Sequence, residues 1–459
     1  MIKDLLYLIS DHILWIPFAL VFLASIVISI KSRFIQIRAL PKMFKMIFQA
    51  PKRLCTTGCA QTISPRSALW VSLSTCVGMG NIAGPIIAIG LGGPGALAGF
   101  IVASFFGAAV GYVEVFLAIK YRKKQNDGSF LGGAMQYLDR EFTPWLGLLY
   151  AFATGLLMLS WSAGQANQLA ILLAAKGIPT LVTGTFLTAI VIFVLVGGIK
   201  RLGAICDKIV PVMFIAYCAA TLWIISLNFR VLPEVFGLMF TALFSPVGIV
   251  GITMGYGMQK AIRWGLARAV QATETGVGTL TFPHSAARGT TAYNQGVMAI
   301  ATTFGNGIIC LLTGLTIMTS GAWKIPGATF DIRMFSNILA SYFPTFGPNI
   351  LIFCAILFAF GTIIGNGYNG SICFLHTTKN RWLWLYYAIS GVAVFIGSIM
   401  DVKLVWTIID FFILPVVIPH MIAIVILAFK SSKVQYHEDM LNSPMNAYRE
   451  TDQRKISNE

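Results

Sequence analysis

Charged side chains are scarce in this sequence, and acidic ones are the scarcest. Only 11% of the 459 residues are charged, whereas soluble domains carry roughly 25%. Hydrophobic residues make up 57% of the chain. A chain this apolar cannot cover its own surface with polar groups, which excludes a soluble enzyme, a disordered chain and a secreted disulfide scaffold. The composition predicts an all-α polytopic membrane protein.

Several functional motifs are also absent. The eight cysteines are scattered through apolar runs without a zinc-binding set, so we expect free thiols. The chain has no GxxxxGK[ST] loop for ATP, no repeated polar rings typical of a channel and no acid–base pair for an intramembrane enzyme. These absences favour a secondary transporter. A membrane channel or a transporter-like sensor remains the alternative from a different class.

Apolar runs long enough to cross a bilayer, which takes roughly 20 residues, number eleven. They fall at about 12–30, 66–90, 95–120, 144–174, 181–198, 206–227, 243–262, 291–319, 346–376, 382–400 and 403–429. Residues 1–54 are expected to form an N-terminal transmembrane helix and a basic amphipathic segment. A ten-helix core follows over 55–429, with repeats of about 55–229 and 230–429. Residues 430–459 are expected to form a cytoplasmic tail.

The net charge of +16 becomes a topological signal once these spans are placed. When successive segments between the spans are assigned to alternate sides of the membrane, 27 of the 33 Lys and Arg residues fall on one side. The positive-inside rule makes that side cytoplasmic, with the N-terminus outside and the C-terminus inside. The expected location is therefore the bacterial cytoplasmic membrane, and no nucleic-acid partner is implied. Residues 33–49 interleave basic and apolar residues, as an interfacial helix does; a plain basic loop is the alternative.

Two glycine-rich runs interrupt the expected spans. The second span contains Gly78-Met79-Gly80-Asn81-Ile82-Ala83-Gly84, and each glycine weakens a helix by roughly 1 kcal/mol relative to alanine. The run predicts an unwound segment lining a cavity, or a helix-packing face. The span at 243–262 contains a second such run, Gly248–Gly257, five helices later. Interruptions at matching positions of two inverted halves favour a transporter binding site.

Further motifs extend over nearly the whole chain. They are Gly90–Ala96, Tyr112–Val115, Lys120–Arg122, Gly132-Gly133, Gln165–Asn167, Gly197–Arg201, Ala261–Arg263, Ala267-Arg268, Glu274, Gly276, Gly278, His284, Gly321–Trp323, Phe358–Phe360, Leu404–Trp406 and Asp410. With Gly80–Gly84, they resemble the alanine/glycine:cation symporter family, of the sodium:alanine symporter type. The resemblance implies a leucine-transporter-type 5+5 inverted repeat plus one N-terminal helix. It also implies sodium-coupled uptake of small neutral amino acids.

The chain departs from the family pattern at residues that bear on selectivity. Met79 replaces a threonine, and Thr253 and Asn366 stand where the family has aromatic residues. If those aromatics limit the pocket, Thr253 and Asn366 make it larger and more polar. Gly361 replaces a hydroxyl residue beside Thr362, and His420 replaces an asparagine. We therefore expect an amino-acid substrate larger or more polar than alanine.

The expected substrate-binding residues are drawn from both glycine-rich runs and from two other helices. They are Gly78, Met79, Gly80, Asn81, Gln165, Asn167, Gly251, Thr253, Gly255 and Asn366. Carbonyls of Gly78 and Met79, with the Thr362 hydroxyl, are expected to bind Na⁺ as coupling ion. A helix N-terminus near Gly80 suits the substrate carboxylate.

Proton coupling or exchange is the alternative mode of transport, with His420 as a relay; a hydrogen-bonded packing histidine is the simpler interpretation of that residue. Asp410 is expected to act in gating, and Glu114 to pair with a basic residue. Glu274 and His284 are expected in a cytoplasmic segment, as a gate network or a solvated turn. The expected partners are the substrate, sodium and the lipid bilayer, and the oligomeric state stays open, with a monomer possible.

Overall fold

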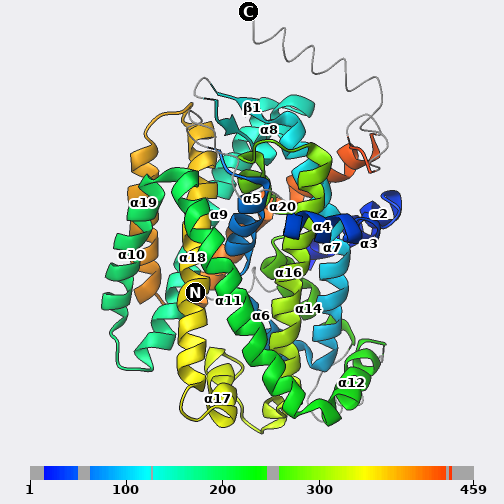
Figure 1. The fold of residues 1–459 in the computed structure, drawn as a ribbon, viewed down its shortest axis with the longest axis vertical. Helices are drawn as coiled ribbons and strands as arrows, with labels where there is room; N and C mark the ends of the chain where they lie inside the picture. Colours follow the sequence, from blue (N-terminus) through cyan, green and yellow to red (C-terminus); the bar gives the residue numbers. More distant parts are fainter. Residues whose placement is uncertain (1–14, 50–61, 126–127, 245–257, 431–433, 437–459) are drawn as a thin grey trace, which may run out of the picture.

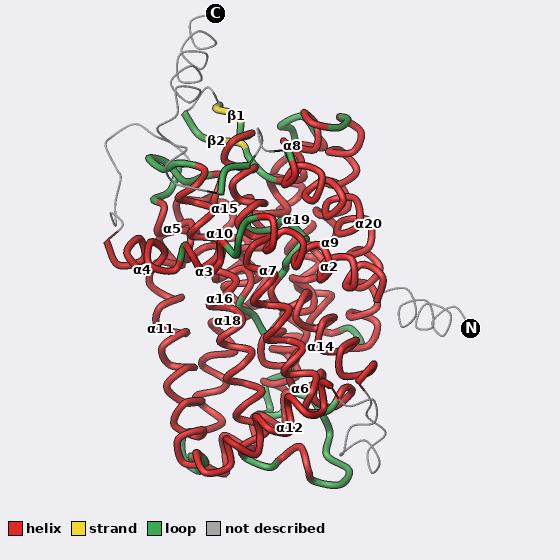
Figure 2. Tube along the Cα trace, turned by 90° about the vertical axis from the view of Figure 1, so that its right-hand side faces the viewer, coloured by secondary structure: helices red, strands yellow, loops and turns green. Residues whose placement is uncertain are grey.

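The computed structural model describes residues 15–49, 62–125, 128–244, 258–430 and 434–436. Almost all of them are helical. The two strands among the described residues, β1 (Lys123–Lys124) and β2 (Phe130–Leu131), form an antiparallel hairpin. The long helices run side by side, with α12 and α17 at one end and α8 and the hairpin at the other (Figures 1 and 2). We call these the α12 end and the α8 end.

Eighteen α-helices lie within the described residues. Their bounds are α2 Trp15–Lys31, α3 Ile35–Arg38, α4 Leu40–Gln49, α5 Pro65–Cys76, α6 Gly80–Gly92, α7 Pro94–Tyr121, α8 Ala134–Glu141, α9 Pro144–Ala174, α10 Thr180–Val196, α11 Gly198–Leu227, α12 Leu232–Phe244, α14 Met258–Thr273, α15 Thr281–Ser285, α16 Ala292–Thr319, α17 Ile332–Tyr342, α18 Gly347–Thr377, α19 Leu383–Ile399 and α20 Val402–Phe429. Short 3₁₀ turns occur at Phe229–Val231 and Ala322–Lys324.

The all-α membrane architecture expected from composition is confirmed. Six of the described helices, α7, α9, α11, α16, α18 and α20, are long and apolar enough to cross a bilayer. The pair α5 and α6 passes the same test as one bent span, and α2, α10 and α19 are shorter apolar helices. The remaining expected span, 243–262, falls mostly on residues outside the described ones. The count of eleven therefore stays a prediction.

The first broken helix lies at the start of the predicted glycine-rich run. Helix α5 ends at Cys76, Val77 leaves the helical region with φ −87° and ψ 94°, and α6 begins at Gly80 at 43° to α5. The break thus occupies residues 77–79, and the rest of the run opens α6. Pro85 inside α6 lacks a backbone N–H, so it leaves one further carbonyl without its usual helical donor.

A second broken helix lies in the segment expected to be cytoplasmic; the burial of Glu274 and His284 contradicts the solvated turn, whereas the side of the membrane stays a prediction. Helix α14 packs against α6 and α7, ends at Thr273, and is followed by an irregular stretch, 274–280, before the short helix α15. Three residues of this stretch have positive φ: Glu274 at 54°, Gly276 at 82° and Gly278 at 87°. Helix α14 therefore leads into the break that the described residues show, and the run 248–257 lies outside them.

Buried polar side chains from neighbouring helices hold this second break. The Glu114 carboxylate on α7 accepts from the Gly276 amide at 3.1 Å, and His420 on α20 binds the Gly276 carbonyl through Nδ1 at 2.7 Å. The other ring nitrogen of His420 lies 2.5 Å from the Tyr137 hydroxyl on α8. Because a carbonyl only accepts, Nδ1 carries the proton. His420 is thus a hydrogen-bonded packing residue in this structure.

Two further side chains complete the attachment. The Tyr150 hydroxyl on α9 donates to the Val277 carbonyl at 2.6 Å, and Asn369 on α18 donates to the Thr279 carbonyl at 3.4 Å. Freed backbone groups in a membrane must find such partners, because hydrocarbon supplies none. The second break is therefore fixed to α7, α9, α18 and α20 together.

Replacing Gly278 by alanine should destabilise the fold. A Cβ at Gly278 would stand 2.5 Å from the Tyr150 hydroxyl oxygen, and its φ of 87° disfavours any side chain. The expected cost is about 1–2 kcal/mol or more, seen as a lower melting temperature in detergent. Gly237→Ala on α12 is the control, since a Cβ there meets nothing within 4 Å. Equal melting temperatures for the two variants would contradict this account of the break.

Candidate functional site

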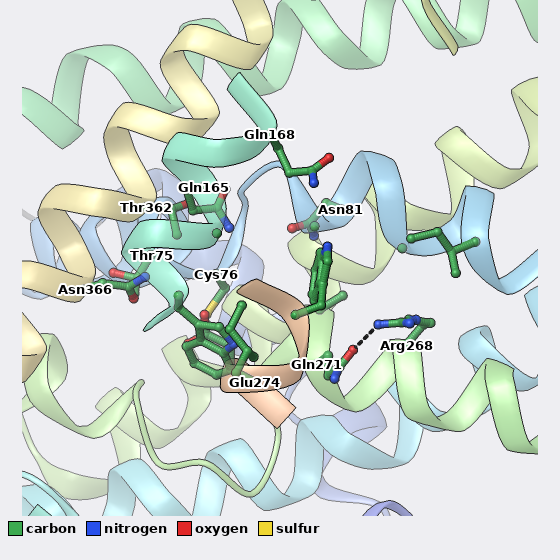
Figure 3. Close-up of a pocket in the computed structure, with 18 residues that line it drawn as sticks. Thr75, Cys76, Asn81, Gln165, Gln168, Arg268, Gln271, Glu274, Thr362 and Asn366 are labelled. Atoms are coloured by element: carbon green, nitrogen blue, oxygen red, sulfur yellow. Dashed lines mark hydrogen bonds between the residues drawn. The ribbon is translucent and has the colours of Figure 1, made fainter. Parts of the chain in front are cut away.

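A small internal cavity lies where the two broken helices approach each other (Figure 3). Its volume is about 50 Å³, room for a few water molecules. Residues of α5, α6, α9, α14, α18 and α20, together with Glu274 of the second break, line it: Thr75, Cys76, Gly80, Asn81, Gly84, Ile87, Trp161, Gly164, Gln165, Gln168, Arg268, Gln271, Ala272, Glu274, Thr362, Asn366, Trp406 and Ile409. This cavity is the candidate binding site.

The first break offers two backbone amides that side chains bind. Asn81 Oδ1 accepts from the Gly78 amide at 3.0 Å, and Gln165 Oε1 on α9 accepts from the Met79 amide at 2.7 Å. Gly78 has to be small here, because a Cβ would lie 2.6 Å from the Thr362 hydroxyl oxygen and 2.7 Å from Gln165 Oε1. Four of the expected residues, Gly78, Met79, Asn81 and Gln165, are thus brought together.

Asn81 also ties the break to α14 and α16. Its Nδ2 donates to Asn306 Oδ1 and lies 3.3 Å from the Cys310 sulfur, both on α16. Asn306 in turn donates to the Ala272 carbonyl near the end of α14. This chain of amides links the start of α6 to the last turn of α14, and so joins the two broken helices across the cavity.

Thr362 on α18 completes the first break from the other side. Its hydroxyl lies 3.1 Å from the Ser74 carbonyl and 3.2 Å from the Val77 carbonyl. In an unbroken helix the Gly78 amide would bond to the Ser74 carbonyl, but here it bonds to Asn81, which leaves that carbonyl available. The carbonyls of Gly78 and Met79, by contrast, accept from amides in the first turn of α6.

Asn366, one turn further along α18, is the polar side chain of the cavity with the fewest hydrogen-bond partners. It is fully buried, and neither its amide oxygen nor its amide nitrogen has a hydrogen-bond partner among the described residues. Leaving a buried polar atom unpaired costs about 1–3 kcal/mol. A bound polar group would remove that cost, so Asn366 is a candidate ligand contact.

Sequence reasoning missed several cavity residues, chiefly Glu274. Its side chain is buried, one carboxylate oxygen accepts from the Thr279 hydroxyl, and the Cys76 thiol contacts it. Only the family motifs included Arg268 and Trp406, and no motif included Gln271. A signal was present for Glu274, because an acid so close to apolar spans is a functional hypothesis by default.

A polar bridge joins α14 and α20 beside the cavity. Arg268 donates to Gln271 Oε1 at 2.6 Å (Figure 3), and Gln271 donates to Asp410 Oδ1 at 2.8 Å. The Arg268 guanidinium also lies 5.4 Å from the centre of the Trp406 ring. Because Arg268 and Gln271 belong to α14 and the other two residues to α20, the bridge joins these helices. The gating role expected for Asp410 stays a prediction.

Other expected residues lie elsewhere or outside the described residues. Asn167 donates to the carbonyls of Gly397 and Met400, both at 2.8 Å, and so fastens α9 to the end of α19 rather than lining the cavity. Gly251, Thr253 and Gly255 fall in 245–257, outside the described residues.

Two broken helices that meet at a central cavity are the arrangement of the leucine-transporter fold. Solved structures of that fold match the chain. A Na⁺-coupled sialic acid symporter in a substrate-bound outward-open state covers 90% of this chain and 87% of its own, at TM-score 0.56 and 12% identity. MhsT in complex with L-phenylalanine covers 84% and 94%, at TM-score 0.59 and 17% identity. These likenesses establish the fold.

Sequence comparison gives the family. The model of the sodium:alanine symporter family matches residues 1–447, and the chain belongs to that family. It is 31% identical over 432 residues to the sodium/alanine symporter AgcS of Methanococcus maripaludis, covering 91% of this chain and 93% of that one. It is 29% identical over 429 residues to a probable sodium/glutamine symporter, GlnT, of Bacillus subtilis, covering 92% and 87%. The chain is thus a multi-pass membrane transporter and not an enzyme.

Removing the carboxylate of the polar bridge should open the cavity. We expect Asp410→Ala to raise the rate at which a small thiol reagent modifies Cys76 by about tenfold, since losing a charged hydrogen-bond acceptor costs about 1.5–3 kcal/mol. The measurement uses purified protein in which the other cysteines are replaced by alanine. Glu234→Ala, which removes a surface partner of Lys324, is the control. An unchanged rate in Asp410→Ala would mean that the bridge does not limit access.

Proposed function

We propose that this chain carries small neutral amino acids together with sodium across the cell membrane, by alternating access to the central cavity. The observation that carries the proposal is the meeting of two helix breaks at a small cavity, lined by several polar side chains, inside an apolar bundle. Such sites bind a zwitterion well, because helix ends of opposite polarity face it. The names of the relatives, which mention alanine and glutamine with sodium, support the same class.

The substrate carboxylate fits the start of α6. The amides of Gly78 and Met79 are bound by Asn81 and Gln165, whereas Gly80, the first residue of α6, lies on the cavity wall. Backbone amides and the positive end of the helix dipole favour an anion at this position. We place the carboxylate there.

The substrate ammonium fits the opposite wall. Helices α5 and α14 both end at the cavity, so their last carbonyls and the negative ends of their dipoles face it. The Glu274 carboxylate lies on the same wall as Cys76. An ammonium there would interact with a formal negative charge as well as with the carbonyls of the two helix ends.

The substrate side chain is expected to reach Asn366. The unpartnered amide of Asn366 offers one donor and one acceptor, a match for the hydroxyl or carboxamide of serine, threonine or glutamine. Thr253, like Asn366, stands where the family pattern has an aromatic residue, and it is proposed to widen the pocket as well. The glutamine named for the Bacillus subtilis relative is consistent with such a substrate.

The sodium ion is proposed to bind between α5 and α18. The Thr362 hydroxyl and the carbonyls of Ser74 and Val77 converge there, and hard oxygen ligands suit sodium. Ser74 adds a buried hydroxyl: a Cβ at position 361 would stand 2.3 Å from it, so Gly361 makes room for this oxygen. The hydroxyl that Gly361 lacks is thus supplied from α5. The carbonyls of Gly78 and Met79 are replaced in this proposal by those of Ser74 and Val77.

The proposed orientation places the α12 end outside and the α8 end in the cytoplasm. The basic residues of 31–66, 120–140, 200–208 and 379–381 and the tail after residue 430 then face the cytoplasm, as the positive-inside rule requires. Lys260, Arg263 and Arg268 lie on α14 instead, which reduces the asymmetry without reversing it. The N-terminus is then outside and the C-terminus inside.

Uptake into vesicles tests the proposed function. The purified protein, reconstituted in liposomes, is given a panel of labelled amino acids under an inward sodium gradient and then under a proton gradient alone. We expect sodium-dependent uptake of neutral amino acids, with serine, threonine or glutamine among the competitors. Uptake with protons alone would favour the proton-coupled alternative, and competition by alanine and glycine only would contradict the enlarged pocket. No uptake under either gradient would overturn the proposal.

Asn366→Trp should narrow selectivity. A tryptophan fills the space beside the cavity and removes the amide, so uptake of glutamine-sized or hydroxylated substrates should fall by about tenfold relative to alanine. The readout is the ratio of the two uptake rates, which a general loss of folded protein does not change. An unchanged ratio would place the substrate side chain away from Asn366.

Thr362→Val should weaken sodium use, whereas Thr362→Ser should retain it. Valine keeps the shape but removes the oxygen, and one lost oxygen ligand of about 1–2 kcal/mol raises the half-saturating sodium concentration roughly tenfold. The measurement is uptake against sodium concentration at fixed amino acid. A shift in maximal rate alone, with the same half-saturating sodium, would remove Thr362 from the cation site.

A further inference from the structure

A second cavity, apart from the central one, is an apolar groove on the side of the bundle. Its volume is about 530 Å³, and α4, α5, α7, α11 and α16 line it. Large side chains from α4, α5, α11 and α16 form most of its wall, among them Phe44, Trp70, Phe214 and Phe304. The one hydroxyl residue of the lining, Ser104, donates to the Phe100 carbonyl of its own helix at 2.9 Å. The groove therefore suits an occupant that is almost entirely hydrocarbon.

The surface around the groove is also apolar and faces outward from the bundle. Phe44 is 54% exposed, Ile215 on α11 is 67% exposed and Ile308 on α16 is 45% exposed. In a membrane transporter such side chains face lipid acyl chains, since exposed apolar area of this extent is not stable against water. A lipid chain can thus enter the groove from the bilayer.

Basic residues lie within one helical turn of lining residues on three of the helices that form the groove. Lys45 follows the lining residue Phe44 on α4, Arg66 lies one turn before Trp70 on α5, and Lys208 lies one turn before Pro211 on α11. Lys45 and Lys208 are exposed. Asp207 is the acidic neighbour, and it accepts from the Ser67 hydroxyl at 2.8 Å.

The segment that contains α4 strengthens this positive field. Residues 31–54 carry no acidic residue, and α4 runs across the direction of the long helices (Figure 1). It presents Leu40, Met43, Phe44 and Ile47 to the groove. An interfacial helix with this arrangement places lysines at headgroup level.

We propose that this groove binds one anionic phospholipid, with an acyl chain among the aromatic residues and the headgroup phosphate near Lys45, Arg66 and Lys208. Basic sites between transmembrane helices bind anionic headgroups in this way. The lipid contacts Leu69, Trp70 and Leu73 of α5, the half-helix that ends at the central cavity. This proposal does not depend on which substrate the central cavity binds.

Lipid retention during purification tests the proposal. The protein is extracted into detergent, incubated with phosphatidylglycerol or phosphatidylethanolamine of the same acyl chains, and analysed by native mass spectrometry. We expect one phosphatidylglycerol to stay bound at concentrations about tenfold lower than phosphatidylethanolamine. Equal retention of the two lipids would overturn the headgroup assignment. Glycerol phosphate, which lacks acyl chains, should not compete, and competition by it would overturn the role of the groove.

Two variants separate the headgroup from the acyl chain. Combined Lys45→Gln, Arg66→Gln and Lys208→Gln should abolish the preference for phosphatidylglycerol, with Lys176→Gln and Arg230→Gln at other sites as the charge control. Ala301→Phe fills the groove and should release both lipids, with Ala220→Phe, in a separate shallow apolar groove, as the control. Melting temperatures in lipid-free detergent verify that each variant is folded. Unchanged lipid binding in the first variant or in Ala301→Phe would contradict the proposal.

Discussion

Backbone groups freed by a break in a membrane helix must be bonded inside the protein, and the structure is organised around this constraint. Helices α5 and α6 are separated at 77–79, and α14 and α15 at 274–280. Around each break, polar side chains of otherwise apolar helices lie at the level of the freed backbone groups and hydrogen-bond to them. Asn81, Gln165 and Thr362 serve the first break, and Glu114, His420 and Tyr150 serve the second. The positions of these buried polar residues follow from their attachment to the breaks.

Two unbroken helices contact both breaks and act as a scaffold. On α9, Gln165 binds the first break and Tyr150 the second; on α18, Thr362 binds the first and Asn369 the second. Each helix is long, 31 residues in both cases, so one rigid element can position groups on both sides of the cavity. The cavity is then shaped by the spacing along α9 and α18 as much as by the broken helices themselves.

The sequence predicted the helical membrane architecture and the first break, because long apolar runs and clustered glycines are local signals. Sequence patterns did not predict the break at 274–280, for a physical reason. This stretch contains only Gly276 and Gly278, each required by a positive φ, and the side chains that hold it, Glu114 and His420, lie far from it in sequence. The break predicted at 248–257 lies outside the described residues and stays a prediction. Asn167 shows the same limit, since a polar residue in a span can fasten two helices as well as line a site.

The two breaks differ in what they leave available to a ligand. At the second, the Gly276 amide and the carbonyls of Gly276, Val277 and Thr279 are all bound by protein side chains. At the first, Gly80 faces the cavity and the Ser74 and Val77 carbonyls are held only by one hydroxyl. A ligand shifts a conformational equilibrium only through contacts that differ between states. Sodium and the substrate carboxylate should therefore act mainly on the first break, and the substrate should contact the second break only through Glu274, while the rest of that break keeps α14 and α15 in register with the scaffold. Substitutions at the second break other than at Glu274 should lower stability first, and those at the first break should lower affinity first.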